Sequence, residues 1–431
     1  MKNNKGLGRF VTARTVSILG DRLAETVLPI VILLATGDAL LAGLVTAANV
    51  APTFLLSLPI GHWVDLRERR RLMISADLWR AVLSVGLAVA LFDPNPSTLI
   101  LVLISFLLGC GDVLFNVSAQ SYLPALVPST RIMRANTALE TGDAAATLAG
   151  PAVAGAVLTR FSGSAAIAMN AASFLVSALL LLRLPDSRPG EKTEARETAS
   201  GEDAAPRRPV RTEMLAGVKL LIKDPTQRLL QTGGAYLYLA AGAAGVMVIS
   251  LAVQELHLSN LQVGLLLSAA GIGGLAVGFL VARVVERATW GPLLGMSLLG
   301  IALTCVWLAV TGSFGGAFVA VLLMDGCSAL AFITAGSARQ IFTPADRLGR
   351  LTAATGIVNG AVRTLGAAGG GAFVLAFGAR NALLALGICG IAAATPLLLA
   401  RVARVSMNSA SGTAEPAEAA PSAPSAPSAP S

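Results

Sequence analysis

Residues 127–155 read VPSTRIMRANTALETGDAAATLAGPAVAG, and residues 343–371 read TPADRLGRLTAATGIVNGAVRTLGAAGGG. The two stretches align without a gap at a constant difference of 216 in residue number. The motif P-x-x-R-x-x-R begins at Pro128 and recurs at Pro344, and Gly155 falls on Gly371. This spacing is far longer than the roughly 20–50 residues of stacked repeats. We therefore interpret the chain as a duplicated half-molecule, an arrangement found in membrane transporters.

The composition is that of an integral membrane protein. Of the 431 residues 55% are hydrophobic and 13% are charged, against about 45–50% and 25% in soluble domains. The net charge of +8 raises the question of nucleic acid, but the basic residues lie between apolar runs, not among aromatic residues on one face. The four cysteines lie inside apolar runs and there are only two histidines. We expect no nucleic-acid binding, disulfide framework, metal site, cofactor or enzymatic activity.

Apolar runs of about 20 residues, the length that crosses a bilayer, predict six helices in each half. They cover 11–35, 40–64, 72–92, 98–122, 131–158 and 163–184, then 228–253, 261–283, 290–311, 314–338, 347–376 and 380–402. Lys and Arg gather on the side of the N-terminus, while the opposite loops hold only Arg160 and Arg380. This bias predicts a multi-pass protein of the cytoplasmic (inner) membrane with both termini in the cytoplasm.

Four regions follow from this pattern. We expect an N-terminal six-helix bundle over 1–184, a cytoplasmic linker over 185–225, a C-terminal six-helix bundle over 226–404 and a disordered cytoplasmic tail over 405–431. The linker lacks apolar periodicity except at 213–223, where the pattern predicts a short amphipathic helix at the membrane surface.

A basic turn, GHWVDLRERRR at 61–71, follows the second predicted span. It resembles the G-x-x-x-D-R-x-G-R-R loop of the major facilitator superfamily, although Glu68 replaces the second glycine. The resemblance implies a cytoplasmic latch that holds the two halves together, formed by Gly61, Asp65, Arg69, Arg70 and Arg71. The alternative is a short inside loop that collects arginines for topology alone. Ala282 stands where the acid would be in the second half, so the latch would be asymmetric.

Further motifs resemble the drug:proton antiporter branch of that family, which includes macrolide-efflux and enterobactin-exporter proteins. They include S-x-x-G-D ending at Asp21, Asp77-x-x-Arg80, and GPAVAG at 150–155. In that branch the last motif, here Gly150, Pro151 and Gly155, is the antiporter signature of the fifth helix. Proline bends a helix and small residues let a neighbour approach closely, although ordinary small-residue packing explains the pattern too.

Charged residues at membrane depth indicate function or pairing, because each costs about 2.5–3.5 kcal/mol on insertion scales. We predict proton coupling by Asp21, Glu25, Glu140 and Asp143, with Glu140 and Asp21 as the main pair. We predict a polar substrate cavity lined by Asp112, Asn116, Asp325 and Arg363.

The internal repeat supports these roles, because Glu140 falls on Gly356 and is not part of the shared framework. A carboxylate in an apolar cavity loads and releases a proton near neutral pH, since burial disfavours its charged form. The alternative is pairing at helical spacing, Arg22 with Glu25 and Arg80 with Asp77. We interpret the second pair as structural and near the cytoplasmic end.

Together these observations predict an all-α membrane protein with twelve transmembrane helices in two six-helix bundles, the major facilitator fold. The expected function is secondary active efflux of a small organic molecule, a drug or antibiotic, by proton antiport. No phosphate-binding G-x-x-x-x-G-K-[ST] motif supports ATP drive. The expected partners are the solute, protons and the lipid bilayer, and the expected state is a monomer. The alternatives are a siderophore or natural-product exporter and a non-transporting scaffold or receptor.

Overall fold

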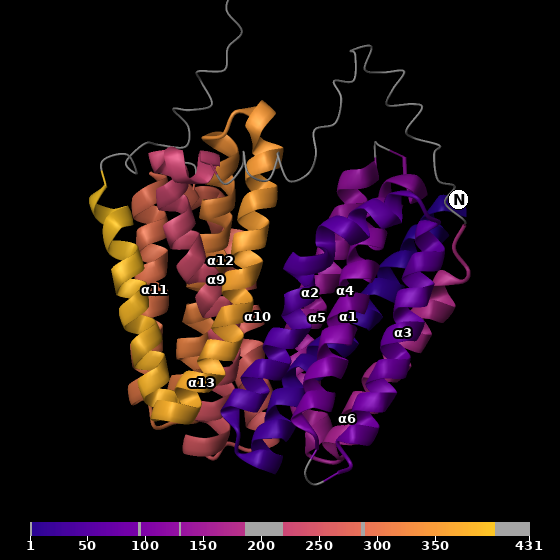
Figure 1. Cartoon of the computed structure of the whole chain (residues 1–431), viewed down its shortest axis with the longest axis horizontal. Helices are drawn as coiled ribbons and strands as arrows, with labels where there is room; N and C mark the ends of the chain where they lie inside the picture. The colour runs from indigo at the N-terminus through magenta and orange to yellow at the C-terminus, as the bar shows by residue number, and fades with distance from the viewer. Residues whose placement is uncertain (1, 94–95, 129–130, 186–218, 286–288, 401–431) are drawn as a thin grey trace, which may run out of the picture.

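The computed structural model describes residues 2–93, 96–128, 131–185, 219–285 and 289–400. Figure 1 shows two bundles of helices side by side, the indigo-to-magenta N-terminal half and the orange-to-yellow C-terminal half. The N-terminal half contains α1 (Lys2–Thr36), α2 (Ala39–Asp65), α3 (Arg69–Ala90), α4 (Thr98–Leu126), α5 (Ile132–Leu158) and α6 (Gly163–Leu181). The C-terminal half contains α9 (Pro225–Ser250) with the π-helical turn η2 (Leu251–Glu255), α10 (Asn260–Val285), α11 (Trp290–Val310), α12 (Phe314–Ile341) and α13 (Ala345–Leu399).

The helix α13 consists of two spans joined at Gly378, whose φ of 81° is not helical. Glu255 stabilises the start of the second span, because its carboxylate accepts the backbone N–H groups of Ala379 and Arg380 at 3.1 and 3.3 Å. The Arg380 side chain also donates to Glu255 at 2.6 Å. Counting α13 twice, the twelve predicted helices are confirmed, and their ends lie within four residues of the expected ones except at the start of α1, which begins at Lys2 and not at residue 11.

Charge separates two helices from the others. In the described part of the chain nine helices are long and apolar enough to cross a membrane, with α13 counted once. The helices α1 and α5 are not among them. These two helices carry Asp21, Glu25, Glu140 and Asp143. The predicted site acids therefore lower the apolar character of α1 and α5, together with the basic residues of α1.

The two halves contact each other mainly through two helix pairs, α2 with α13 and α5 with α10. Each pair crosses at two glycines. A Cβ at Gly43 would lie 3.0 Å from the Cα of Gly371, and one at Gly155 would lie 3.0 Å from the Cα of Gly264. Gly155 and Gly371 are equivalent in the internal repeat, so the two crossings are related by the duplication.

These crossings lie at the end of the molecule opposite the termini. Two hydrogen bonds join the halves there, from Gln254 to the carbonyl of Gly37 at 3.1 Å and from Asn260 to the carbonyl of Leu158 at 3.1 Å. In Figure 1 the bundles meet at this lower end and separate towards the end that bears the N-terminus. We call the lower end the closed end.

The outer surface is apolar, as a bilayer requires. Val82, Val85 and Val89 follow one face of α3 and are 71%, 52% and 62% exposed. All four cysteines are free, and Cys389 is exposed, not buried as its apolar run suggested. Residues 219–223 of the predicted amphipathic helix are helical, while residues 186–218 of the predicted linker and the tail from 405 lie outside the described residues.

Candidate functional site

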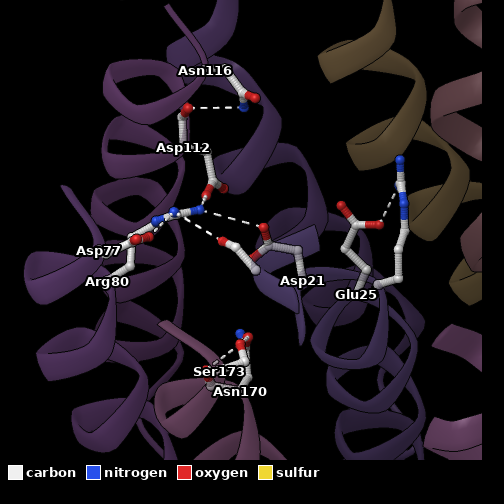
Figure 2. A network of polar contacts seen from close by, with 10 residues as sticks. Asp21, Glu25, Asp77, Arg80, Asp112, Asn116, Asn170 and Ser173 are labelled. Carbon is white, nitrogen blue, oxygen red and sulfur yellow. Dashed lines mark hydrogen bonds and ion pairs between the residues drawn. The ribbon is translucent and has the colours of Figure 1, made fainter. Parts of the chain in front are cut away.

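Arg80 on α3 joins three aspartates from three helices (Figure 2). Its guanidinium is 1% exposed and pairs with Asp77, which is fully buried one helical turn away. The same group donates to Asp112 on α4 at 2.8 Å and to Asp21 on α1 at 3.4 Å, and it contacts the Ser17 hydroxyl at 3.2 Å. We call Asp21, Asp77, Arg80 and Asp112 the Arg80 cluster.

Aromatic rings and a glycine hold Arg80 in place. The guanidinium carbon lies 4.6 Å from the ring centre of Phe115 and 4.2 Å from that of Phe174, distances typical of cation–π contacts. A Cβ at Gly111 would lie 2.6 Å from the Arg80 Cγ atom, so only glycine leaves room for the arginine stem. The surroundings therefore fix the position of the arginine between the three carboxylates.

The Arg80 cluster is not neutral when all its acids are ionised. One guanidinium faces three carboxylates, which leaves a net charge of −2. Buried charge without a partner is costly, so the cluster is electrostatically unbalanced in this form. Asp77 is fully buried, whereas the side chains of Asp21 and Asp112 are 27% and 31% exposed. Asp21 and Asp112 are therefore the two acids of the cluster that water can reach.

A cavity inside the N-terminal half adjoins the cluster. Its volume is about 90 Å³, and we call it the N-half chamber. Its polar wall includes Asp21, Glu25, Asn49, Ser84, Ser105 and Asp112. Leu28, Leu87 and Ile167 contribute to its apolar wall. The chamber is too small for an organic solute, since ligand sites measure about 300–1,000 Å³.

A larger open cavity lies between the halves, and we call it the central cavity. It has about 480 Å³ of space and is lined by Glu140 and Asp143 on α5, by α10 around Gly274, and by Asp325 on α12. Asp143 pairs with Arg14 of α1 at 3.2 Å. This cavity has the size and the two-sided lining that an organic solute needs.

Comparison with known proteins agrees with this geometry. The sequence profile described as Major Facilitator Superfamily matches residues 10–367. The chain belongs to this superfamily. It is 24% identical over 356 residues to the enterobactin exporter EntS of Shigella boydii, a match that covers 81% of each chain. It is 26% identical over 202 residues to the uncharacterised MFS-type transporter YfiS of Bacillus subtilis, covering 45% of this chain and 47% of YfiS.

Solved structures share the fold of the superfamily. A bacterial homologue of the human lysosomal transporter Spinster, in an inward-facing unoccupied conformation, superposes with a TM-score of 0.70 at 16% identity, covering 95% of this chain and 97% of that one. A bacterial homologue of the iron transporter ferroportin, in an inward-facing state, gives a TM-score of 0.65 at 18% identity, covering 90% and 98%. The protein is therefore a membrane transporter of the major facilitator fold.

The structure divides the site residues that the sequence grouped together. Asp21 and Glu140 line different cavities, the N-half chamber and the central cavity. Glu25 pairs with Arg22 at 2.7 Å, as the helical spacing predicts. Asn116 donates to the backbone carbonyl of Asp112 at 3.0 Å. Arg363 is exposed on α13, and its backbone carbonyl packs against Gly242.

The antiporter motif of α5 faces two neighbouring helices. Gly150 packs on α1, because a Cβ there would lie 2.4 Å from the Cβ of Arg22. The Pro151 carbonyl and Gly155 approach Gly264 of α10 at the crossing described above. The helix continues through Pro151 from Ile132 to Leu158. Close approach of neighbours is thus observed for this motif.

The superfamily loop at 61–71 lies at the open end of the N-terminal half. Gly61 is half-buried near the end of α2, and Asp65 is exposed as its last residue. Arg69 and Arg70 are half-buried in the first turn of α3. Arg71 pairs with Glu68, the residue that replaces the second glycine of the motif. The corresponding basic side chains of the second half, Arg283 and Arg287, lie outside the described residues.

Sequence reasoning missed the convergence on Arg80. It paired Arg80 with Asp77 alone, whereas the structure also brings Asp21 and Asp112 to the same guanidinium. It also assigned no role to Ser84 and Ser105, which line the N-half chamber. A possible signal was the occurrence of small polar residues in otherwise apolar spans, but sequence alone does not show which of them share a cavity.

Proposed function

We propose that the protein is a secondary active exporter that moves a small organic molecule out of the cytoplasm while protons move in. The observation that carries this proposal is the separation of two sites. The Arg80 cluster holds more carboxylates than one arginine neutralises, while the central cavity has about 480 Å³ of space and is lined by both halves. A proton site and a cargo site in one rocking molecule are the parts that antiport requires.

The direction of opening is part of the proposal. The basic residues on the side of the termini support an orientation with both termini in the cytoplasm of an inner-membrane protein. The crossings at Gly43 and Gly155 then close the periplasmic end, and the central cavity opens inward. The two named structural neighbours are likewise described as inward-facing.

We assign separate roles to the acids. Asp21 and Asp112 exchange the proton, because they share Arg80 and remain partly exposed. Glu140, Asp143 and Asp325 face the cargo from opposite halves, with Arg14 neutralising Asp143. The carboxylates of Glu140 and Asp325 in the central cavity favour a cargo that carries a basic group or several hydrogen-bond donors.

The relatives favour a second candidate cargo. EntS, matched over 81% of both chains, is named for the export of enterobactin. A siderophore or related natural product is therefore the alternative to a drug or antibiotic, with the same mechanism. A panel that contains cationic drugs, macrolides and catechol siderophores separates these cargos by accumulation in an efflux-deficient host.

The experiment that tests export and coupling uses inverted membrane vesicles. Uptake of the best panel compound is measured with and without an imposed pH gradient, acidic inside. We expect gradient-dependent uptake that collapses with a protonophore. Binding or uptake that ignores the gradient would contradict proton antiport, and a complete absence of uptake for every compound would favour the scaffold or receptor alternative.

A further inference from the structure

The N-half chamber contains two buried hydroxyl groups that the helices do not satisfy. The side chains of Ser84 on α3 and Ser105 on α4 are each 1% exposed. Neither hydroxyl oxygen has a hydrogen-bond partner among the described residues, and both line the chamber. Most buried hydroxyls have a partner, and these two, unlike the other unpartnered serines among the described residues, line a cavity with room for one.

The size and chemistry of the chamber select water as that partner. Its volume of about 90 Å³ holds roughly three water molecules, at the ~30 Å³ that each occupies in the liquid. Water both donates to carboxylates and accepts from serine hydroxyls. The amides of Asn49 and Asn170 on the same wall add further donors and acceptors.

The chamber wall carries the partly exposed acids of the Arg80 cluster and also the more exposed acid Glu25. Asp21 and Asp112 lie at one part of its wall, and Glu25, whose side chain is 53% exposed, lies at another. In Figure 2 Glu25 lies apart from Arg80, on the side where helices of the C-terminal half appear. Asp21 and Glu25 are one helical turn apart, about 6 Å along α1. This distance is the span of one or two water molecules.

The charged groups around the two acids are few. Arg80 and Asp77 face them from α3, and Glu25 and its ion-pair partner Arg22 face them from α1. The helices α2 and α6 contribute the neutral amides of Asn49 and Asn170 to the chamber wall. A proton that leaves Asp21 or Asp112 therefore meets water and Glu25 before it meets another base on this wall.

The wall towards the closed end is apolar. Leu87 lies in the last turn of α3 and Ile167 in the first turns of α6, and each is 1% exposed. Leu28 adds a third apolar side chain from α1. An apolar barrier at this end prevents water, and hence protons, from passing through the half when the opposite end is open.

We propose that the N-half chamber is a hydrated proton passage, closed by Leu87 and Ile167, in which water held by Ser84 and Ser105 connects Asp21 and Asp112 with Glu25 and the central cavity. The passage rests on the proton antiport proposed above. It adds to that function the route by which the proton leaves the Arg80 cluster while the closed end stays sealed.

The test measures hydrogen–deuterium exchange of the carboxylic acids by infrared spectroscopy, which needs no cargo. Purified full-length protein at mildly acidic pH is moved into D₂O, and the shift of the protonated carboxyl band is followed. Asp21→Asn and Asp112→Asn assign the band. Ser84→Val and Ser105→Val fill the chamber, and we expect exchange to slow by about tenfold or more, because it then requires a local opening of the helices.

Ser118→Val is the matched control. Ser118 lies on α4 like Ser105, is fully buried, and has a hydroxyl without a partner among the described residues, but it does not line the chamber. Exchange in this variant should match the wild type. Filled variants that exchange as fast as the wild type would overturn the proposal, and so would the lack of any exchangeable band assigned to Asp21 or Asp112.

A second measurement uses the unmodified protein, in case the filled variants do not fold. Hydroxyl-radical labelling marks side chains that lie next to bound water. Leu87 on the chamber wall should be labelled several-fold more than Leu298, a fully buried leucine of α11. Equal labelling would refute the passage. Neither measurement depends on transport, so an exporter that ignores the pH gradient would disprove antiport independently of the chamber.

Discussion

At the residue scale the central feature is one arginine that serves three acids. Asp77 and Arg80 are both buried and form an intrahelical pair, whereas Asp21 and Asp112 come from other helices and stay partly exposed. The buried pair holds the position of the guanidinium, and in the proposed mechanism the partly exposed acids exchange the proton. The same guanidinium therefore has a structural role and an electrostatic one, which helical spacing alone does not reveal.

Arg80→Met should destabilise the protein by about 3–5 kcal/mol, because it leaves the charge of Asp77 buried without a partner. The double variant Arg80→Met/Asp77→Asn should recover most of this loss, since it removes both members of the fully buried pair. Thermal unfolding in detergent measures both. A double variant no more stable than the single one would show that Asp77 is not the main structural partner of Arg80.

Asp112→Asn and Glu140→Gln should separate coupling from cargo binding. Asp112→Asn should abolish the dependence of vesicle uptake on the pH gradient, because it removes an acid that exchanges protons at Arg80. Glu140→Gln should keep that dependence and weaken binding of a cationic cargo by about three- to tenfold, the size expected for one solvated charge contact. Loss of gradient dependence in Glu140→Gln would instead assign coupling to Glu140.

At the element scale the two halves rely on paired glycine crossings. The approach of α5 to α10 leaves no space for a side chain, since a Cβ at Gly155 would also lie 2.6 Å from the carbonyl oxygen of Asn260. The crossing of α2 with α13 at Gly43 and Gly371 repeats this arrangement. In the proposed transport cycle these helices separate when the closed end opens. The crossings therefore set the relative stability of the inward-open and outward-open states.

Gly155→Ala should shift the population towards the state in which this end is open, because the added methyl group clashes only in the closed arrangement. Spin labels at Arg160 and Gly312, both exposed near this end, report the distance between the halves in a cysteine-free background. Gly245→Ala is the control, as nothing lies within 4 Å of a Cβ at that position. An unchanged distance distribution in Gly155→Ala would argue against a conformational role for the crossing.

At the scale of the whole molecule the halves meet at one end and carry different loops at the other. The N-terminal half has the acid Asp65 beside Arg69 and Arg70, while the second half has Ala282 at the corresponding position. We propose that this one loop acts as the latch when the open end closes. An asymmetric latch stabilises the outward-open state without a matching contact on the repeat-related side.

Asp65→Asn should slow export by about tenfold, while folding and membrane insertion remain normal. The reason is that the outward-open state loses roughly 1.4 kcal/mol of stabilisation, and this free energy corresponds to a tenfold change in rate. Cargo affinity in the inward-open state should not change. Arg67→Gln is the control, since Arg67 lies in the same turn but outside the family pattern. Wild-type export rates in Asp65→Asn would refute the latch.

The sequence by itself determined the twelve spans, the two halves and the family, because span length and the repeated P-x-x-R-x-x-R motif are local properties of the chain. It also marked α1 and α5 as the charged helices. Only the tertiary structure decided which acids share a partner. Asp21, Asp77 and Asp112 converge on Arg80 because three helices pack together at that depth, and such packing depends on side-chain fit between distant segments. The separation of Glu140 from Asp21 into two cavities has the same physical cause.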